Sequence, residues 1–248
     1  MHVSFGAVQA LAGAGLTLHA GRVHALVGPN GSGKSTLLAV LAGDLVPTGG
    51  TVEIGGEVRR AGGGPQARVR DGVARTPQRT VLLPRATPAR QVAVGVRGGR
   101  RTPGEVTRHL LATPSSADRD RDRAALVEAA LAAAGLDGVR DADPATLTVG
   151  EQRLLQVARV VATGASVLLL DEPAAGMTAP ERARLAEVLR ALAGNGAAVL
   201  LVEHDMRLVG QVADEVTVLT DGRVLASGSP AQVRADPAVR ASYLGTGS

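Results

Sequence analysis

The sequence predicts an α/β fold in which a largely parallel sheet carries helices on both faces. Short apolar runs alternate with longer amphipathic stretches, and this alternation is typical of parallel strands joined by crossover helices. Two of the runs, Val167–Leu170 and Val199–Val202, contain no polar residue, as expected of central strands buried on both sides. With 248 residues, the chain is long enough to bury a sizeable core around such a sheet.

The expected strands are short and are separated by four amphipathic helical patterns. The strands are Leu16–His19, Val23–Val27, Thr51–Ile54, Val167–Leu170, Ala197–Val202, Val216–Leu219 and Arg223–Ala226, and the helices are Lys34–Ala42, Gln152–Ala162, Pro180–Ala193 and Arg207–Ala213. Between them lies a region with little strand signal and helical patterns at Ala89–Val96 and Ala124–Ala134. We therefore expect one domain, residues 1–248, with an α/β core (residues 1–84 and 145–248) and an inserted, mainly helical subdomain at about residues 85–144.

Composition excludes several functional classes. The chain is 45% hydrophobic and 20% charged, which excludes a disordered protein. Phe5 and Tyr243 are the only aromatic residues and the net charge is only +4, so binding of nucleic acid on stacking platforms or in a basic groove is not expected. The sequence has no cysteine, which fits a reducing compartment, and no apolar stretch long enough to span a bilayer, so we expect a soluble chain.

A phosphate-binding loop follows the strand Val23–Val27. The match to G-x-x-x-x-G-K-[ST] consists of Gly28, Pro29, Asn30, Gly31, Ser32, Gly33, Lys34 and Ser35, and it is followed by Thr36 and a helical pattern. Glycines let backbone amides face phosphate oxygens, and the helix that follows adds its positive end. Lys34 is placed to contact the β- and γ-phosphates, and Ser35 to ligate Mg²⁺. The alternative is a glycine-rich turn with an exposed lysine.

Two acidic residues end the buried strand Val167–Leu170. Asp171 and Glu172 lie at the carboxyl end of this strand, the edge at which open α/β sheets bind ligands. Successive strand residues point to opposite sides, so Asp171 can hold Mg²⁺ while Glu172 polarises an attacking water. The alternative is a solvent-facing pair without catalytic function.

Three further segments narrow the interpretation to one family. The segment Leu147-Thr-Val-Gly-Glu-Gln152 precedes a helix and resembles the signature motif of ABC-type ATPases. Gln78 matches the position of their Q-loop, and His204 matches their switch histidine. The resemblance covers nearly the whole chain. It implies a P-loop NTPase core of the RecA type, with an antiparallel β edge and an inserted helical subdomain.

The resemblance also implies a mechanism shared between two ATPase subunits. In this family each ATP lies between the phosphate loop of one subunit and the signature segment of the other. Thr148 and Gly150, with Val149 and Glu151 beside them, would thus serve the partner's nucleotide. The resemblance further makes Gln78 a sensor of Mg²⁺ that connects to the transmembrane partner, and His204 a contact of the γ-phosphate. Phe5 occupies roughly the position that stacks on adenine.

Bland alternatives remain for three of these residues, and the sequence departs from the family pattern at others. Gln78 could be an ordinary loop amide, His204 a histidine at a helix start, and Phe5 a core anchor. Val149 stands where the family signature usually has Gly, and Thr178 replaces an Asp often found in that loop. Members usually have a further strand upstream, which implies an incomplete edge sheet here or a longer polypeptide.

One subgroup is resembled in particular, namely the ATPase subunits of branched-chain amino acid importers and their urea and amide relatives. The resemblance lies in Asp171–Met177, Val202–Met206, Asp221–Pro230 and Asp236–Gly245. It implies a second ATPase subunit, identical or different, with permease subunits and a solute-binding protein that contacts them. The chain would dock on the permease at the cytoplasmic face of the membrane. The competing functions are a non-transport ABC ATPase acting on DNA or the ribosome, and a nucleotide-binding regulatory module.

Overall fold

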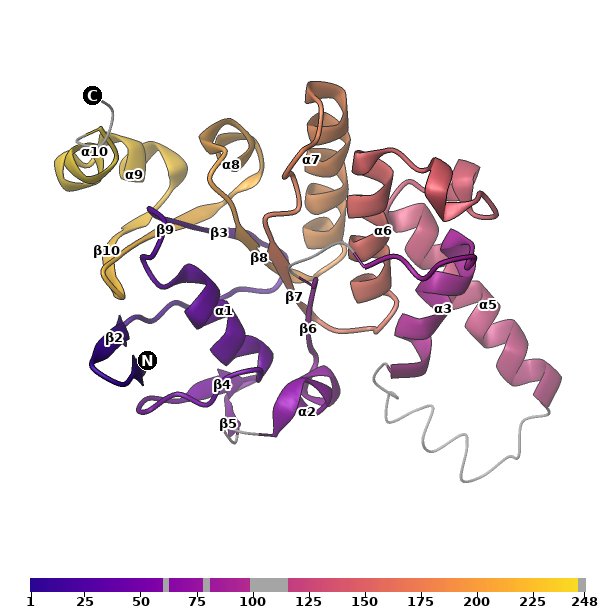
Figure 1. Ribbon diagram of the computed structural model, residues 1–248, viewed down its shortest axis with the longest axis horizontal. Coiled ribbons are helices and arrows are strands. Elements are labelled where there is room, and N and C mark those ends of the chain that lie inside the picture. The colour runs from indigo at the N-terminus through magenta and orange to yellow at the C-terminus, as the bar shows by residue number, and fades with distance from the viewer. Residues whose placement is uncertain (60–62, 78–80, 99–115, 245–248) are drawn as a thin grey trace.

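The computed structural model describes residues 1–59, 63–77, 81–98 and 116–244, and its centre is a six-stranded sheet (Figure 1). The strand order is β10-β9-β3-β8-β7-β6. Every neighbouring pair is parallel except β9 and β10, which are antiparallel at one edge. The strands are β3 (Val23–Val27), β6 (Val73–Arg75), β7 (Val167–Asp171), β8 (Ala198–Val202), β9 (Glu215–Thr220) and β10 (Arg223–Gly228). The predicted α/β class, with its antiparallel edge, is confirmed.

Two small antiparallel hairpins accompany this sheet. They are formed by β1 (His2–Phe5) with β2 (Val8–Ala12), and by β4 (Val52–Ile54) with β5 (Glu57–Arg59). The strand predicted at Leu16–His19 is wrong, because this segment has no strand assignment. Leu16 and Leu18 do turn one face toward the core, and this produced the alternating pattern, but no neighbouring strand pairs with them.

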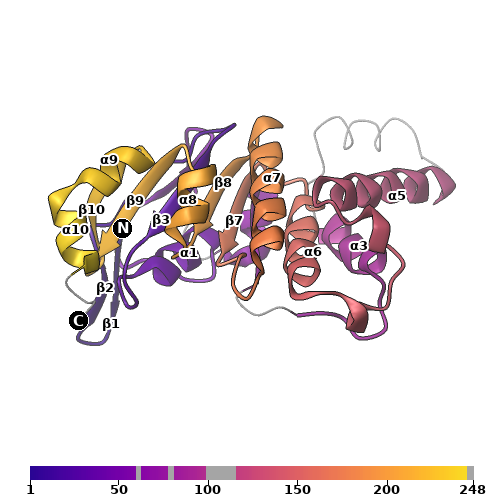
Figure 2. The same cartoon turned by 90° about the horizontal axis from the view of Figure 1, so that it is seen from above.

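The helices lie on both faces of the sheet, and three of them gather at one end of the molecule (Figures 1 and 2). The described helices are α1 (Lys34–Ala42), α2 (Gly64–Asp71), α3 (Pro88–Gly98), α5 (Ser116–Ala133), α6 (Val149–Val161), α7 (Ala179–Gly194), α8 (Met206–Val212), α9 (Pro230–Ala235) and α10 (Pro237–Leu244), with 3₁₀ turns at Asp137–Val139 and Pro144–Thr146. Helices α3, α5 and α6 pack against one another. The sequence predicts that the inserted subdomain ends at about residue 144, but α6, which packs with α3 and α5, begins at Val149. The boundaries of the subdomain therefore stay a prediction.

The alternation of side chains along the central strands separates two hydrophobic clusters. On β7, Leu168 and Leu170 pack with residues of α6 and α7, whereas Leu169 packs with residues of α1 on the opposite face. Each fully buried leucine contributes roughly 1.5–3 kcal/mol relative to an exposed one. The unbroken apolar runs of β7 and β8 therefore hold helices on both sides, as the sequence predicted.

The strand register brings three chain segments to the same edge of the sheet. Val202 at the end of β8 is opposite Leu26 of β3 on one side and opposite Asp171 of β7 on the other. The residues that follow each of these strands consequently leave the sheet next to one another. In the part of the chain that the structure describes, no helix combines the length and the apolar character needed to cross a membrane.

Candidate nucleotide-binding and catalytic site

The glycine loop between β3 and α1 has a backbone path that side chains would obstruct. Gly31 and Gly33 have φ angles of 82° and 101°, in the left-handed region that favours glycine. A Cβ atom on Gly33 would lie 2.6 Å from the carbonyl oxygen of Ala10 on β2. The loop is thus packed against the β1–β2 hairpin, and Gly33 is required by space as well as by backbone conformation.

Lys34 folds back over this loop. Its Nζ donates hydrogen bonds to the carbonyl oxygens of Gly28 (2.8 Å) and Pro29 (2.9 Å), and the side chain is buried. Burial lowers the pKa of Lys34, and the carboxylates of Glu172 and Asp171 oppose that shift. The ammonium is therefore within electrostatic range of both acids, and the exposed-lysine alternative is wrong.

The start of α1 is prepared for an anion. Gly33 at the N-cap supplies no side chain, and the first turn contains no acidic residue, so no carboxylate from this turn competes for the helix amides. Ser32 Oγ is buried and has no hydrogen-bond partner among the described residues. Asn30, Gly31 and Ser35 are exposed around this helix end. Free amides, an unpaired buried hydroxyl and a cation fit the phosphate groups of a nucleotide.

The two acids at the end of β7 occupy different environments. Asp171 is buried, and its amide donates a 3.0 Å hydrogen bond to Thr76 Oγ1. Glu172 is exposed, has a φ angle of 45°, and donates its amide to the carbonyl oxygen of Val202 at 2.9 Å. A positive φ in a residue with a side chain is strained and persists only where its surroundings fix it. The turn therefore directs Glu172 out of the sheet, while Asp171 stays inside.

Asp171 is paired with an arginine that the sequence analysis did not single out. Arg75 Nη2 lies 2.9 Å from Asp171 Oδ2, and Arg75 Nη1 lies 2.9 Å from Asp44 Oδ2. The pairing depends on β6 lying next to β7, and β6 is only three residues long. Its brevity left no periodic signal by which the sequence could have revealed Arg75.

The oxygen ligands suit a magnesium ion that arrives with a nucleotide. Within the described residues, no group of three or more His, Cys, Asp or Glu side chains could hold a metal ion without help. Mg²⁺ needs only one or two protein ligands when phosphate oxygens and water complete its octahedron. The Asp171 carboxylate and the exposed Ser35 hydroxyl are of the right chemical type for that role.

His204 leaves the sheet after β8 and is 69% exposed on its side chain, so it is free to contact a ligand. Glu203, which the sequence analysis did not consider, is buried beside it. Glu203 accepts hydrogen bonds from the amides of Ala174 (2.9 Å) and His204 (3.3 Å). Burial raises the pKa of Glu203, and these hydrogen bonds oppose the shift. The carboxylate thereby ties the chain after β8 to the turn after β7.

The segment resembling the ABC signature forms the start of α6. Thr148 is its N-cap and makes a capping box with Glu151, so the Glu151 carboxylate faces its own helix end. Val149 is exposed and Gly150 is buried. The Gly150 amide donates a 3.0 Å hydrogen bond to Glu181 Oε1 of α7. Hydrogen bonds from the amide and hydroxyl of Thr178 contribute most to lowering the pKa of Glu181 to about 2.

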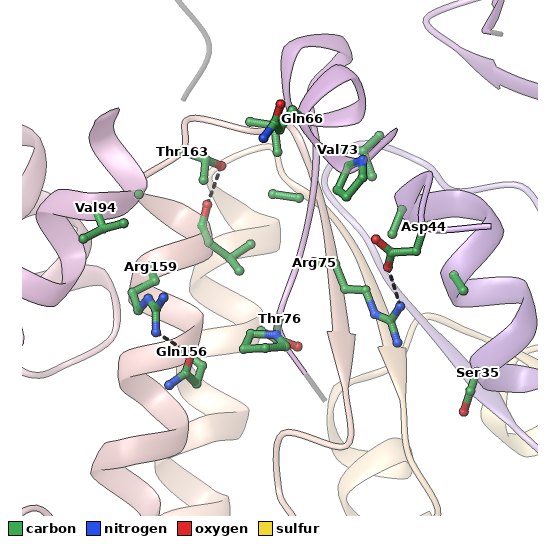
Figure 3. A pocket seen from close by; sticks show the side chains of 18 residues that line it. Ser35, Asp44, Gln66, Val73, Arg75, Thr76, Val94, Gln156, Arg159 and Thr163 are labelled. Atoms are coloured by element: carbon green, nitrogen blue, oxygen red, sulfur yellow. Dashed lines mark hydrogen bonds and ion pairs between the residues drawn. The ribbon is translucent and has the colours of Figure 1, made fainter. Parts of the chain in front are cut away.

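Two of the predicted site residues stand apart from this group. Phe5 ends β1 with 54% of its surface exposed, which excludes the core-anchor alternative and leaves its ring available for stacking. Gln78 lies outside the described residues. Its neighbours Thr76 and Pro77 line a cleft of about 770 Å³ between α1 and α2 on one side and α3 and α6 on the other. Figure 3 shows Arg75 beside Asp44 on the α1 side of that cleft, with Ser35 further along the same side.

Comparison with known proteins accounts for this arrangement. A family model described as "ABC transporter" matches residues 11–175. The chain belongs to the ABC transporter family. It is one of the ATP-binding, ATP-hydrolysing cassettes of that family. A second model, described as "Branched-chain amino acid ATP-binding cassette transporter", matches residues 223–248 of this cassette.

Two curated relatives match the cassette over nearly their full lengths. The high-affinity branched-chain amino acid transport ATP-binding protein BraF of Pseudomonas aeruginosa is 34% identical over 97% of this chain and 94% of its own. The corresponding protein LivG of Escherichia coli K12 is 36% identical over 97% and 94%. A crystal structure of the ADP conformation of an ABC transporter cassette superposes with a TM-score of 0.83 and 25% identity, over 99% of this chain and 96% of that one.

Proposed function

We propose that this cassette binds Mg·ATP between residues 28–36 and the acids that follow β7, and hydrolyses it there. Lys34 and the free amides at the start of α1 bind the β- and γ-phosphates, while Asp171 and Ser35 hold the magnesium ion. The metal neutralises charge on the phosphate oxygens during transfer. Glu172 accepts the proton of the attacking water, and His204 with Gln78 positions the γ-phosphate and the metal. Phe5 stacks on the adenine.

The single observation that carries this proposal is the convergence of three strand ends. The register across β3, β8 and β7 places Leu26, Val202 and Asp171 side by side. The glycine loop, His204 and Glu172 follow these residues within two positions. A nucleotide in the loop would therefore meet the catalytic carboxylate and the histidine without rearrangement of the sheet. Positioning and electrostatic stabilisation account for most catalysis of phosphoryl transfer, so such a fixed arrangement suits it.

We also infer that a second ATPase subunit completes the site. One chain offers the loop at residues 28–36 and, on a separate lobe, the start of α6 with Thr148 and Gly150. In an antiparallel pair, each α6 start would face the nucleotide of the opposite subunit. The exposure of Thr148 and Val149 supports this, because both residues are accessible to a partner. The partner is a second copy of the chain or a different cassette.

The transport partner that we propose is a permease for branched-chain amino acids or related small polar solutes, aided by a solute-binding protein. The names of BraF and LivG and the match of residues 223–248 support this solute class. The cassette would sit at the cytoplasmic face of the membrane. The cleft beside residues 76 and 77 would receive the permease, because it adjoins the segment that leads to Gln78.

Recovery of the tagged cassette from detergent-treated membranes of its own cells tests the transport function. We expect an integral membrane permease in the purified complex, and uptake of radiolabelled leucine by the complex in ATP-loaded proteoliposomes. Uptake of urea or a short-chain amide with no competition by leucine would contradict the proposed solute class but support the transport function.

Two other outcomes would favour the competing functions. Recovery with ribosomes or DNA, and never with a permease, would make the cassette a non-transport ATPase. Tight ATP binding without any hydrolysis in the complete complex would make it a nucleotide-binding regulatory module.

A further inference from the structure

The guanidinium of Arg75 is shared between two carboxylates of different burial. Asp171 has 7% of its side chain exposed and Asp44 has 40%, while Arg75 itself has 14%. Arg75 Nε is buried without a hydrogen-bond partner among the described residues. Arginine presents its donors in a rigid fork, so it can bridge two carboxylates at once. Asp171 is thus neutralised by a cation of the protein itself in this structure.

The proposed function gives Asp171 a second cation. Mg²⁺ carries two positive charges, and a guanidinium on the same carboxylate would repel it. The contact with Asp44, already 2.9 Å long, offers Arg75 a partner that lies outside the proposed metal site. Figure 3 shows this contact at the end of α1, in the cleft that Ser35 also lines.

We propose that Arg75 is the internal counter-ion of the magnesium site, and that Asp44 retains it when Asp171 takes up Mg²⁺. This inference rests on the proposed role of Asp171 as a magnesium ligand. Arg75 acts through Asp171 and is therefore a positioning residue. Arg75 ends β6 and directly precedes Thr76, which accepts a hydrogen bond from the Asp171 amide and borders the cleft. A shift of Arg75 on metal binding would therefore act on the segment that borders the cleft.

The two partners of Arg75 predict opposite effects. Arg75→Gln removes the competing charge, so Asp171 should bind Mg²⁺ at a lower concentration. Asp44→Asn removes the alternative partner, so Arg75 should stay on Asp171 and the required Mg²⁺ concentration should rise. We expect a shift of about threefold in each direction, because one variant removes the cation that competes with Mg²⁺ for Asp171 and the other removes the alternative partner of that cation. Arg75→Lys keeps the positive charge, so the Mg²⁺ concentration that it requires should lie between those of Arg75→Gln and the wild type.

The experiment measures binding of N-methylanthraniloyl-ADP to the full chain at increasing MgCl₂, with the midpoint Mg²⁺ concentration as the readout. Asp141→Asn is the matched control, because it removes an equal charge from an exposed residue paired with Arg140. In the Arg75→Gln background, Asp44→Asn should cause no further shift, since Asp44 acts only through Arg75. The double variant distinguishes transfer of Arg75 from Asp171 to Asp44 from a direct electrostatic effect of the Asp44 charge on Mg²⁺. Thermal unfolding of each variant verifies that it is folded, and Arg75→Met, which also removes the charge, takes the place of Arg75→Gln if that variant does not fold.

Each outcome has one meaning. Nucleotide binding by the wild type that ignores Mg²⁺ would overturn the proposed metal role of Asp171. A Mg²⁺-dependent wild type would leave that role standing. The inference about Arg75 alone would then be overturned if the two single variants shifted the midpoint in the same direction or not at all, or if Asp44→Asn acted equally without Arg75.

Discussion

The backbone amide of Gly150 donates its hydrogen bond to the carboxylate of Glu181, 3.0 Å away on α7. Under the proposed function, this amide serves the nucleotide of the partner subunit. A carboxylate therefore occupies the position that the partner's phosphate would take. A Cβ atom on Gly150 would lie within 2.6 Å of the Glu181 side chain, so the two residues are in close contact. If the dimer closes as proposed, Glu181 has to move away from the Gly150 amide.

Glu181→Ala should accordingly make ATP more effective. With the carboxylate gone, the Gly150 amide has no competing charged acceptor, and the complex should need about three- to tenfold less ATP for half-maximal hydrolysis. Thr178→Val is the control, because it removes a hydroxyl that binds Glu181 and leaves the Gly150 contact in place. If Glu181→Ala and Thr178→Val needed the same ATP concentration for half-maximal hydrolysis, the Glu181 carboxylate would not compete with ATP.

Lys34 can be followed in solution because it is the only lysine in the chain. Growth on ¹³C-lysine should give one Cε resonance, with a pKa below the ordinary lysine value because the ammonium is buried. Added ADP should raise this pKa, since phosphates favour the charged form. Lys34→Ala should weaken ADP binding by roughly ten- to a hundredfold. A lysine signal that ignores ADP would remove Lys34 from the phosphate site.

Gly33 and Gly31 form a matched pair for testing the loop. Gly33→Ala should lower the free energy of unfolding by about 2–5 kcal/mol, from the left-handed backbone and from the clash with Ala10. Gly31→Ala meets no atom within 4 Å and should cost only about 1–2 kcal/mol from its backbone. Urea unfolding measures both. Equal losses would mean that the loop does not pack against β2 as described.

His24 should make stability depend on pH. It is buried on β3, its Nε2 lies 2.8 Å from Thr217 Oγ1, and burial lowers its pKa despite the nearby Glu215. The unfolded chain therefore takes up a proton first as the pH falls. The free energy of unfolding should decrease below about pH 6.5, by at most about 1.4 kcal/mol per pH unit. In urea unfolding, the free energy of unfolding of His24→Gln should depend less on pH over this range than that of the wild type. Equal pH dependence of the two proteins would exclude His24 as the cause.

The parts of the fold that the sequence predicted are those with strong local patterns. Strand β8 and the first four residues of β7 are continuous apolar runs, β3 is apolar except for His24, and the loop before α1 has a spacing that few other structures use. Strand β1 has a single buried residue and β6 has only three residues, so neither produced a periodic signal. Leu16–His19 had the period of a strand, but strand formation also requires a neighbour, which only the folded chain reveals.

The site divides in the same way. Lys34, Asp171 and Glu172 could be predicted because each directly follows a recognisable strand or loop. Arg75 and Asp171 are 96 positions apart, and their pairing exists only because β6 and β7 are neighbours in the sheet. The contact between Gly150 and Glu181 depends likewise on the packing of α6 beside α7. Such contacts follow from strand order and helix packing, which have no local signature.

Glu172→Gln should separate ATP binding from hydrolysis. The amide retains the size of the side chain but cannot accept a proton from water, so turnover should fall by roughly a hundredfold or more while ATP still binds. The assembled complex should then remain with ATP enclosed between two cassettes. Steady-state hydrolysis and equilibrium ATP binding measure the two properties, and normal turnover would remove Glu172 from the role of base.

Electron cryomicroscopy of the complex carrying Glu172→Gln, purified with Mg·ATP, tests the central claim most directly. The account predicts a triphosphate between residues 28–36 of one cassette and Thr148 and Gly150 of the opposite subunit, with Glu181 displaced from the Gly150 amide. A triphosphate bound elsewhere, or a Gly150 amide still occupied by Glu181 with no second cassette in contact, would contradict it.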